Sequence, residues 1–417
     1  MPPRKRLRGT CTPRGAAAAT VPASPPWALP ADVLLEIVAL SDADTVVRCA
    51  ASCRPLRRSI LSPDFLRRVR DDRDGVLPSS GGLLCFLDKT TATLSLVHPA
   101  PAAAPAAASF VESHLSPFVS RSATDLLEHY SPVTSRGGLV LLEQLRSADG
   151  RRQRSRDRCD MCVYDPMTGG RAFLPYPPDI GWDRCTYVLL TAADDGVKAD
   201  PFLLLAVDTA GLEDCLPFGA RTVSPDANGG KWGPVAYSFH PNMPKGNLVG
   251  HDNSAVVLNG VVHWLMSDAD HVLTYNVDTS AVGSIRLPSR GLLLDNWRAE
   301  ESRLWSSEDG RLGLLTMNEL TVSVWMLLAG GVWARHVELD TTAMVRSLMD
   351  PAELARHYWV DLESSGDQRS GVVLMRLQVH GGRDEALALD MATRQIHGIG
   401  DKSGVPCVVD MASRLQP

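Results

Sequence analysis

The feature that most constrains this chain is a change of hydrophobic pattern near Gly75. Beyond that point helical periodicity almost vanishes, and short apolar runs recur between Gly, Asp, Asn and Pro. These runs are Gly82–Leu87, Leu139–Leu142, Phe202–Val207, Val256–Leu265, Leu312–Thr316, Val322–Leu328 and Val372–Leu377. Short apolar runs bounded by turn residues are typical of β-strands. The pattern therefore predicts that residues 76–411 form one all-β domain.

A weak internal repeat indicates how those strands are organised. Segments that begin at Tyr164, Tyr275 and Leu389 each end one apolar strand, turn at Asp or Asn with Thr nearby, and enter a second strand. Their starts lie 111 and 114 residues apart, so each interval should span the same number of sheet units. At about 40–50 residues per unit, the region predicts a β-propeller of six to eight blades. Generic hairpins in a β-sandwich are the alternative.

The N-terminal part has a different character. Residues 1–26 are rich in Pro and Ala without periodicity, which predicts a disordered arm. The run Arg4–Arg8 is either a nuclear import signal or, more simply, a solvated basic tail. Residues 27–70 then show apolar side chains at helical spacing, with Pro30 and Asp32 suited to a first helical turn. We expect a small, separate helical domain there, so the predicted fold class is α+β multidomain.

This helical segment resembles an F-box. The match begins with Leu29-Pro30, continues through Asp32-Val33-Leu34 and Glu36-Ile37, and extends to Ser52-Cys53-Arg54, Ile60, Pro63 and Phe65. Leu56 stands where the family usually carries Trp, which could lower adaptor affinity. The β region is similar to the F-box-associated, kelch-like propellers of plant F-box proteins, in its stretches Tyr164–Gly169, Val257–Trp264 and Leu320–Leu327.

The resemblance implies a substrate-recognition subunit of an SCF-type (cullin–RING) ubiquitin ligase. Its expected partners are an SKP-type adaptor and, through it, the cullin and RING subunits. Candidates for adaptor contact or F-box core are Leu29, Pro30, Val33, Leu34, Ile37, Val47, Leu56, Ile60 and Phe65. The target would bind to loops of the β domain, since loops lie on the surface and tolerate variation. The candidates there are Trp232, His240, Met243 and Lys245.

No motif for catalysis stands out. Cys159 and Cys162 form a CxxC, but no second ligand pair lies at zinc spacing, so we interpret this segment as a strand. His263 is best explained as a packing residue, and Asp194-Asp195 as a solvated turn. The Arg-rich run 151–158 has no interleaved aromatic residues, so we interpret it as a solvated loop. We therefore predict a non-enzymatic protein with no metal and no cofactor.

The net charge and the number of cysteines limit which partners and which cellular compartment we expect. The formal net charge is −6, which disfavours nucleic acid and anionic membranes as partners. No apolar stretch has the length of a membrane span, and the odd count of nine cysteines suits a reducing compartment. We expect free thiols and a location in the cytoplasm, the nucleus or both. The alternatives are a propeller enzyme or sugar-binding propeller with an incidental helical cap, and an F-box scaffold outside any ligase.

Overall fold

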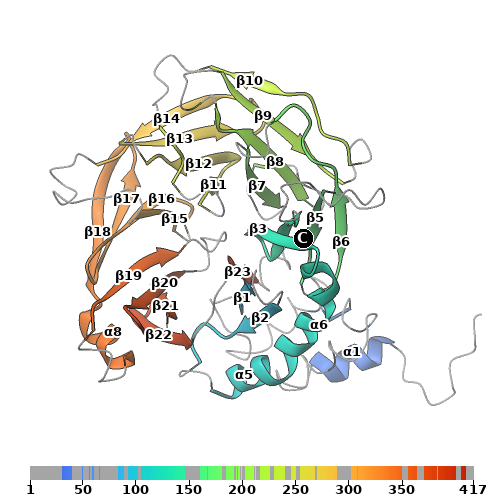
Figure 1. Cartoon of the computed structure of the whole chain (residues 1–417), viewed down its shortest axis with the longest axis vertical. Helices are drawn as coiled ribbons and strands as arrows, with labels where there is room; N and C mark the ends of the chain where they lie inside the picture. The colour runs from blue at the N-terminus through green and yellow to red at the C-terminus, as the bar shows by residue number, and fades with distance from the viewer. Residues whose placement is uncertain are drawn as a thin grey trace, which may run out of the picture.

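The structure, a computed structural model, describes residues 31–39, isolated positions between 49 and 65, and most of 83–409. Its internal gaps include 89–92, 102–104, 146–159, 181–184, 240–245, 289–301, 350–355, 364–370 and 401–404. Within the described part the chain is a ring of antiparallel sheets (Figure 1). The prediction of a β-propeller is thereby confirmed, and the sandwich alternative is excluded.

Five four-stranded sheets follow one another along the chain. Blade 1 contains β3 (Tyr130–Arg136), β4 (Leu139–Gln144), β5 (Met161–Tyr164) and β6 (Arg171–Leu174). Blade 2 contains β7 (Cys185–Thr191), β8 (Phe202–Asp208), β9 (Phe218–Val223) and β10 (Ala236–Ser238). Blade 3 contains β11 (Val256–Leu258), β12 (Val261–Leu265), β13 (His271–Asn276) and β14 (Val282–Arg286). Blade 4 contains β15 (Ser302–Ser306), β16 (Leu312–Asn318), β17 (Thr321–Leu328) and β18 (Val332–Asp340). Blade 5 contains β19 (Tyr358–Glu363), β20 (Val372–Val379), β21 (Glu385–Asp390) and β22 (Gln395–Gly400).

A three-stranded sheet from both ends of the β region closes the ring. It pairs β1 (Leu83–Asp88) with β2 (Thr93–Val97) on one side and with β23 (Val405–Val409) on the other. The helical segments α5 (Pro105–Phe110), η1 (Val111–Leu115) and α6 (Ser116–Leu127) follow, and η1 and α6 pack against β2. The Leu96 backbone amide donates a 2.9 Å hydrogen bond to the Ser116 hydroxyl, so a helix covers the outer edge where a fourth strand would pair.

Buried apolar side chains are clustered between neighbouring sheets all around the ring. The closing sheet packs on blade 1 through one cluster and on blade 5 through another, and the remaining clusters join blades 1 to 5 in order. First strands of successive sheets contact one another, as β3 does with β7 and β15 with β19. Burial between sheets is thus the main apolar contribution to stability.

The repeated turn predicted from the sequence is the hairpin between the third and fourth strands of blades 1, 3 and 5. It joins β5 to β6, β13 to β14 and β21 to β22. In each turn an Asp or Asn side chain accepts the backbone N–H of a Thr three residues on. The distances are 3.2 Å at Asp165, 2.8 Å at Asn276 and 3.0 Å at Asp390. Successive copies of this turn lie two blades apart, on blades 1, 3 and 5, so the intervals between them are nearly equal.

The predicted fold class is wrong for the described residues. The structure is mostly β, with five complete blades rather than six to eight, and no distinct N-terminal helical domain. Ahead of β1, the one helix whose bounds are described is α1 (Ala31–Ala39). The count was overestimated because the closing sheet takes only three strands, and residues 105–127 form helices. Residues 105–110 form a helix because Pro105 suits the first position of α5 and the alanines that follow favour a helix.

Candidate functional site

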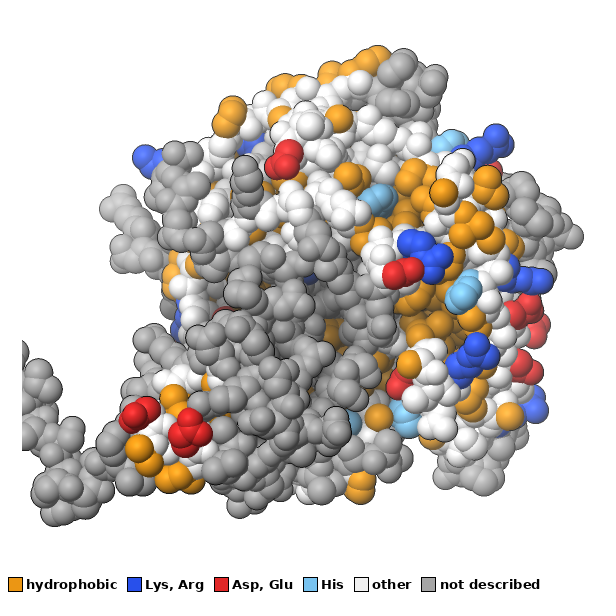
Figure 2. All heavy atoms as spheres, turned by 180° about the vertical axis from the view of Figure 1, so that it is seen from behind, with side chains coloured by type: hydrophobic (Ala, Val, Ile, Leu, Met, Phe, Trp, Pro, Cys, Tyr) orange, Lys and Arg blue, Asp and Glu red, His pale blue; other side chains and the backbone are white. Residues whose placement is uncertain are grey.

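The first candidate site is an exposed apolar face on α1. The helix begins just after Pro30 and carries Asp32 in its first turn, as its sequence indicates. Val33, Leu34 and Ile37 are 39%, 37% and 49% exposed, whereas Val38 is buried. Figure 2 shows this region from behind, with hydrophobic and acidic side chains of the helix on the surface. Three large apolar side chains that are exposed to solvent on one short helix are typical of a surface that contacts another protein.

The structure separates the predicted F-box residues into two groups. Ile60 and Phe65 are buried at 2% and 4% exposure, and Leu56 is half-buried, so these three are packing residues. Val33, Leu34 and Ile37 are available to a partner. The sequence alone could not make this division. Leu29, Pro30 and Val47 lie outside the described residues.

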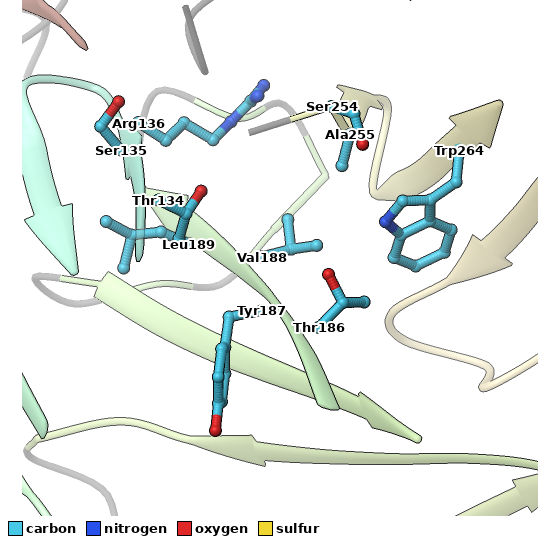
Figure 3. A pocket seen from close by; sticks show the side chains of 10 residues that line it. All are labelled: Thr134, Ser135, Arg136, Thr186, Tyr187, Val188, Leu189, Ser254, Ala255 and Trp264. Atoms are coloured by element: carbon cyan, nitrogen blue, oxygen red, sulfur yellow. The ribbon is translucent and has the colours of Figure 1, made fainter. Parts of the chain in front are cut away.

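The second candidate is a pocket between the inner strands of blades 1, 2 and 3. Its interior has room for about one water molecule, and it is lined by hydroxyl groups, aromatic rings and one arginine. The lining residues are Thr134, Ser135, Arg136, Thr186, Tyr187, Val188, Leu189, Ser254, Ala255 and Trp264. Figure 3 shows Arg136 and Trp264 on opposite sides, with the Tyr187 ring pointing away from the space between them. A space of this size suits a single water molecule, and a sugar-sized ligand would have to widen it.

A buried ion pair fixes the arginine of this pocket. Arg136 ends β3, and its Nη2 and Nε donate to Asp194 Oδ1 over 2.7 and 2.9 Å. Asp194 Oδ2 accepts the Thr191 backbone N–H at 2.8 Å, so the carboxylate also closes the turn after β7. The two side chains are only 8% and 4% exposed. The prediction that Asp194 lies in a solvated turn is therefore wrong. Its local Asp-Asp-Gly signal indicates a turn, but its partner lies 58 residues earlier.

The predicted target-binding residues are only partly placed. Trp232 is half-buried against the core between blades 1 and 2, and its indole N–H donates to the Pro175 carbonyl at 2.8 Å. This arrangement gives Trp232 a packing role. His240, Met243 and Lys245 lie outside the described residues. Just before them, Tyr237 and Phe239 are exposed at 71% and 68% on the outer edge of blade 2.

The cysteine and histidine motifs show no reactive geometry where they are described. Cys162 lies fully buried on β5, while Cys159 is outside the described residues. Cys49, Cys85, Cys162 and Cys185 are free thiols. Burial raises the pKa of the Cys185 thiol to about 12, which disfavours the reactive thiolate. No three His, Cys, Asp or Glu side chains of the described residues come together as a metal site would require.

His263 has the packing environment that the sequence suggested. It lies on β12 beside Trp264, is 8% exposed, and has Nδ1 3.3 Å from the Val256 carbonyl oxygen. Burial is the main cause that lowers its pKa, because an imidazolium would lose its hydration there. Burial likewise lowers the pKa of His98, whose Nδ1 accepts the Ala100 backbone N–H at 3.1 Å.

We expect acidification to weaken the fold through these histidines. An unfolded histidine binds a proton near its ordinary pKa of 6.5, whereas the folded, buried one resists protonation. The stability is therefore present above that pH and is lost as the pH falls toward the lowered folded pKa. Urea unfolding followed at about pH 7.5 and about pH 5.5 should show a smaller pH-dependent loss for His263→Phe than for the wild type. Equal losses in both proteins would contradict this account.

Comparisons with known proteins place the chain in a family without assigning an activity. Puromycin hydrolase is 14% identical with a TM-score of 0.31, over 65% of this chain, which spans only 39% of the hydrolase. The periplasmic gluconolactonase of Pseudomonas aeruginosa is 14% identical with a TM-score of 0.33, over 76% of this chain and 82% of that one. A quinonprotein alcohol dehydrogenase-like protein from Bacteroides thetaiotaomicron is 9% identical with a TM-score of 0.38, over 79% of each chain. Likenesses of this degree carry no inference about activity.

No curated protein matches the sequence. A family model described as a domain of unknown function, DUF7595, matches residues 98–404. That match runs from the end of β2 to the residue before β23 and so includes all five complete blades. Because it covers most of the chain, this protein belongs to the DUF7595 family.

Proposed function

We propose that this protein is the target-binding subunit of an SCF-type (cullin–RING) ubiquitin ligase, with α1 docking on an SKP-type adaptor and the propeller holding a target protein. The exposure of Val33, Leu34 and Ile37 on α1 is the observation that supports the proposal most. These are positions at which the sequence resembles an F-box, and they lie where a partner can reach them. Burial of such a face contributes about 25 cal/mol for each Å² of apolar surface removed from water.

The proposed mechanism is proximity rather than chemistry on this chain. A receptor that holds its target beside a charged ubiquitin-conjugating enzyme raises the local concentration of the target's lysines. The adaptor would link the receptor to the cullin and RING subunits, in the cytoplasm, the nucleus or both. Such a subunit needs no nucleophile or metal of its own.

Replacing Val33, Leu34 and Ile37 together by Asp should abolish adaptor capture. Each substitution puts a charge on the apolar contact surface, where it would be desolvated without a partner. The loss should exceed about a hundredfold in the dissociation constant, measured with purified SKP-type adaptor.

The control places two such charges on exposed apolar residues of the propeller. Leu328 and Val332, at the tip of the β17–β18 hairpin, are 42% and 61% exposed. Their replacement by Asp should leave adaptor affinity unchanged, and thermal melting checks that both variants fold. Undiminished adaptor binding by the folded α1 variant would refute the proposal. Capture of the adaptor without cullin would instead favour the scaffold alternative.

A ligand-binding or catalytic propeller is the second candidate, and the polar lining of the pocket beside Arg136 favours it. Hydroxyl groups from Thr134, Thr186 and Ser254 and an indole suit a polyhydroxylated molecule, for which the space would have to widen. Arg136 adds no net charge there, because Asp194 pairs with it. A thermal-shift screen of sugars, sugar acids and lactones would test this candidate. A stabilising compound whose effect disappears in Thr186→Val would support it. The adaptor experiment is independent of that result.

A further inference from the structure

One face of the first two strands of blade 5 carries a row of polar side chains that ends at an exposed tryptophan. Trp359 on β19 lies opposite Gln378 on β20 in the register, and Asp361 lies opposite Arg376. Side chains two residues apart on a strand share a face, so Glu363 follows Trp359 and Asp361 on the same side. We call these residues the polar ladder: Trp359, Asp361, Glu363, Arg376 and Gln378.

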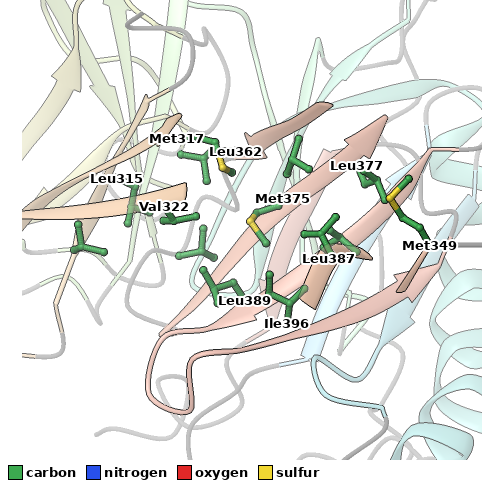
Figure 4. Close-up of a cluster of buried hydrophobic side chains, with 14 of the residues drawn as sticks. Leu315, Met317, Val322, Met349, Leu362, Met375, Leu377, Leu387, Leu389 and Ile396 are labelled. Atoms are coloured by element: carbon green, nitrogen blue, oxygen red, sulfur yellow. The ribbon is translucent and has the colours of Figure 1, made fainter. Parts of the chain in front are cut away.

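The opposite face of the same two strands belongs to the apolar core. Val360 and Leu362 of β19 and Met375 and Leu377 of β20 are buried in the cluster between blades 4 and 5. Figure 4 shows Leu362, Met375 and Leu377 in that cluster. The polar ladder therefore points away from blade 4, and its strands are held by packing on their other side. A preformed surface of this kind loses little conformational freedom when a partner binds.

The closing sheet covers only one end of the ladder face. Leu84 and Phe86 of β1 pack there against the cluster that includes Leu374 of β20. Leu374 is 2% exposed, the Arg376 side chain is 16% exposed, and Trp359 is 42% exposed. Exposure therefore rises along the strands, and Trp359 lies at the end that a partner can reach.

Side-chain contacts fix the ladder and leave it with one net negative charge. Although Arg376 lies opposite Asp361, its guanidinium Nε donates to Glu363 Oε1, so these two charges compensate each other. Asp361 Oδ2 accepts from the neutral amide of Gln378 at 2.8 Å. Among the residues that the structure describes, no cationic side chain forms an ion pair with Asp361. A carboxylate without a counter-charge therefore lies next to the exposed indole on one face of β19.

We infer that the polar ladder binds a basic peptide segment, one of whose Lys or Arg side chains lies across the Trp359 indole and ends at the Asp361 carboxylate. The face of a tryptophan ring attracts a cation more strongly than any other aromatic side chain does. The two residues are about 7 Å apart along the strand, so a long aliphatic stem can cover the ring while its charged head reaches the carboxylate.

Charge complementarity favours this occupant over other ligands of an exposed indole. The ladder carries one net negative charge, and the whole chain carries −6, so a basic segment is attracted at long and at short range. A sugar could also stack on the ring, but it would gain nothing from an uncompensated carboxylate. In the proposed ligase the basic segment would belong to the target, and that part alone rests on the proposed function.

Fluorescence anisotropy with the full chain and no adaptor tests the inference. The probe is a short labelled peptide that alternates Lys and Ser, compared with the same peptide after acetylation of every Lys, which removes the charges and keeps the aliphatic stems. The Lys peptide should bind more tightly, and added salt should weaken its binding. Asp361→Asn and Trp359→Ala should each weaken binding about two- to fivefold, and the double variant about tenfold. Asn keeps an oxygen that can accept from Gln378, so Asp361→Asn removes the charge and leaves the contact.

Asp278→Asn and Tyr237→Ala are the matched controls. Asp278 is exposed in the turn between β13 and β14, and Tyr237 is 71% exposed on blade 2, so the two variants repeat the loss of a charge and of an exposed ring elsewhere. Both should bind the Lys peptide like the wild type, which separates the ladder from the net charge of the chain. Thermal melting checks that every variant folds.

Unchanged binding of the Lys peptide by the folded double variant would overturn the inference. Equal affinity for the acetylated peptide would also overturn it, because the charge would then play no part. The same holds if a labelled oligosaccharide of glucose binds through Trp359 and the Lys peptide does not. Adaptor capture is measured separately, so failure here leaves the proposed function standing.

Discussion

Replacing Asp194 by Ala should lower the free energy of unfolding by about 3–5 kcal/mol. The substitution leaves the Arg136 guanidinium buried at 8% exposure without the carboxylate that accepts from Nε and Nη2. It also removes the acceptor for the Thr191 backbone N–H. A buried charge without its partner keeps the full desolvation penalty, which exceeds the loss of an ordinary hydrogen bond. Urea unfolding followed by circular dichroism gives the value.

Asp125→Ala is the control for this substitution. Asp125 on α6 pairs with Arg171 at 2.9 Å, but the two side chains are 71% and 30% exposed, so water can replace the interaction. The expected loss is below about 1 kcal/mol. The double variant Arg136→Met, Asp194→Leu should be less destabilised than Asp194→Ala, because no unpaired charge remains. Similar losses at Asp125 and Asp194 would show that burial of the ion pair does not increase its contribution to stability.

The ion pair also shows why the burial of Asp194 could not be predicted from the sequence. A turn at Asp194 is indicated locally, but its burial depends on Arg136, which arrives from another blade. Local patterns carry no information about such long-range contacts. The hairpins at Asp165, Asn276 and Asp390 were predictable for the opposite reason, because an Asx side chain and its backbone partner lie three residues apart.

The predicted number of blades was wrong for a related reason. The closing sheet combines β1 and β2 with β23, which lies more than 300 residues away, so no repeat unit marks it. The apolar positions of α1 were predictable from helical spacing. Which of them face solvent was not, since that depends on what packs against the helix. The exposure of Trp359, at 42%, was not predictable either, because an exposed tryptophan and a buried one look alike in a strand-forming sequence.

Trp264→Ala is expected to show the other large effect. The side chain is 1% exposed on β12 and belongs to the cluster between blades 2 and 3. Its ring centroid lies 6.2 Å from that of Phe218 on the neighbouring blade, so the indole contributes to the contact between two sheets. Removing it forfeits a large buried apolar area and leaves a cavity that neighbouring side chains can only partly fill. The free energy of unfolding should fall by about 3–5 kcal/mol.

Trp359→Ala is the matched control, because it makes the same chemical change at a tryptophan that is 42% exposed. Its cost should stay near about 0.5 kcal/mol, since the ring contributes little to the packing between blades. The two variants therefore separate the effect of burial from that of losing an indole ring. Urea unfolding measures both free energies. A Trp359→Ala variant as unstable as Trp264→Ala would contradict the account, because the cost would then not depend on burial between the blades.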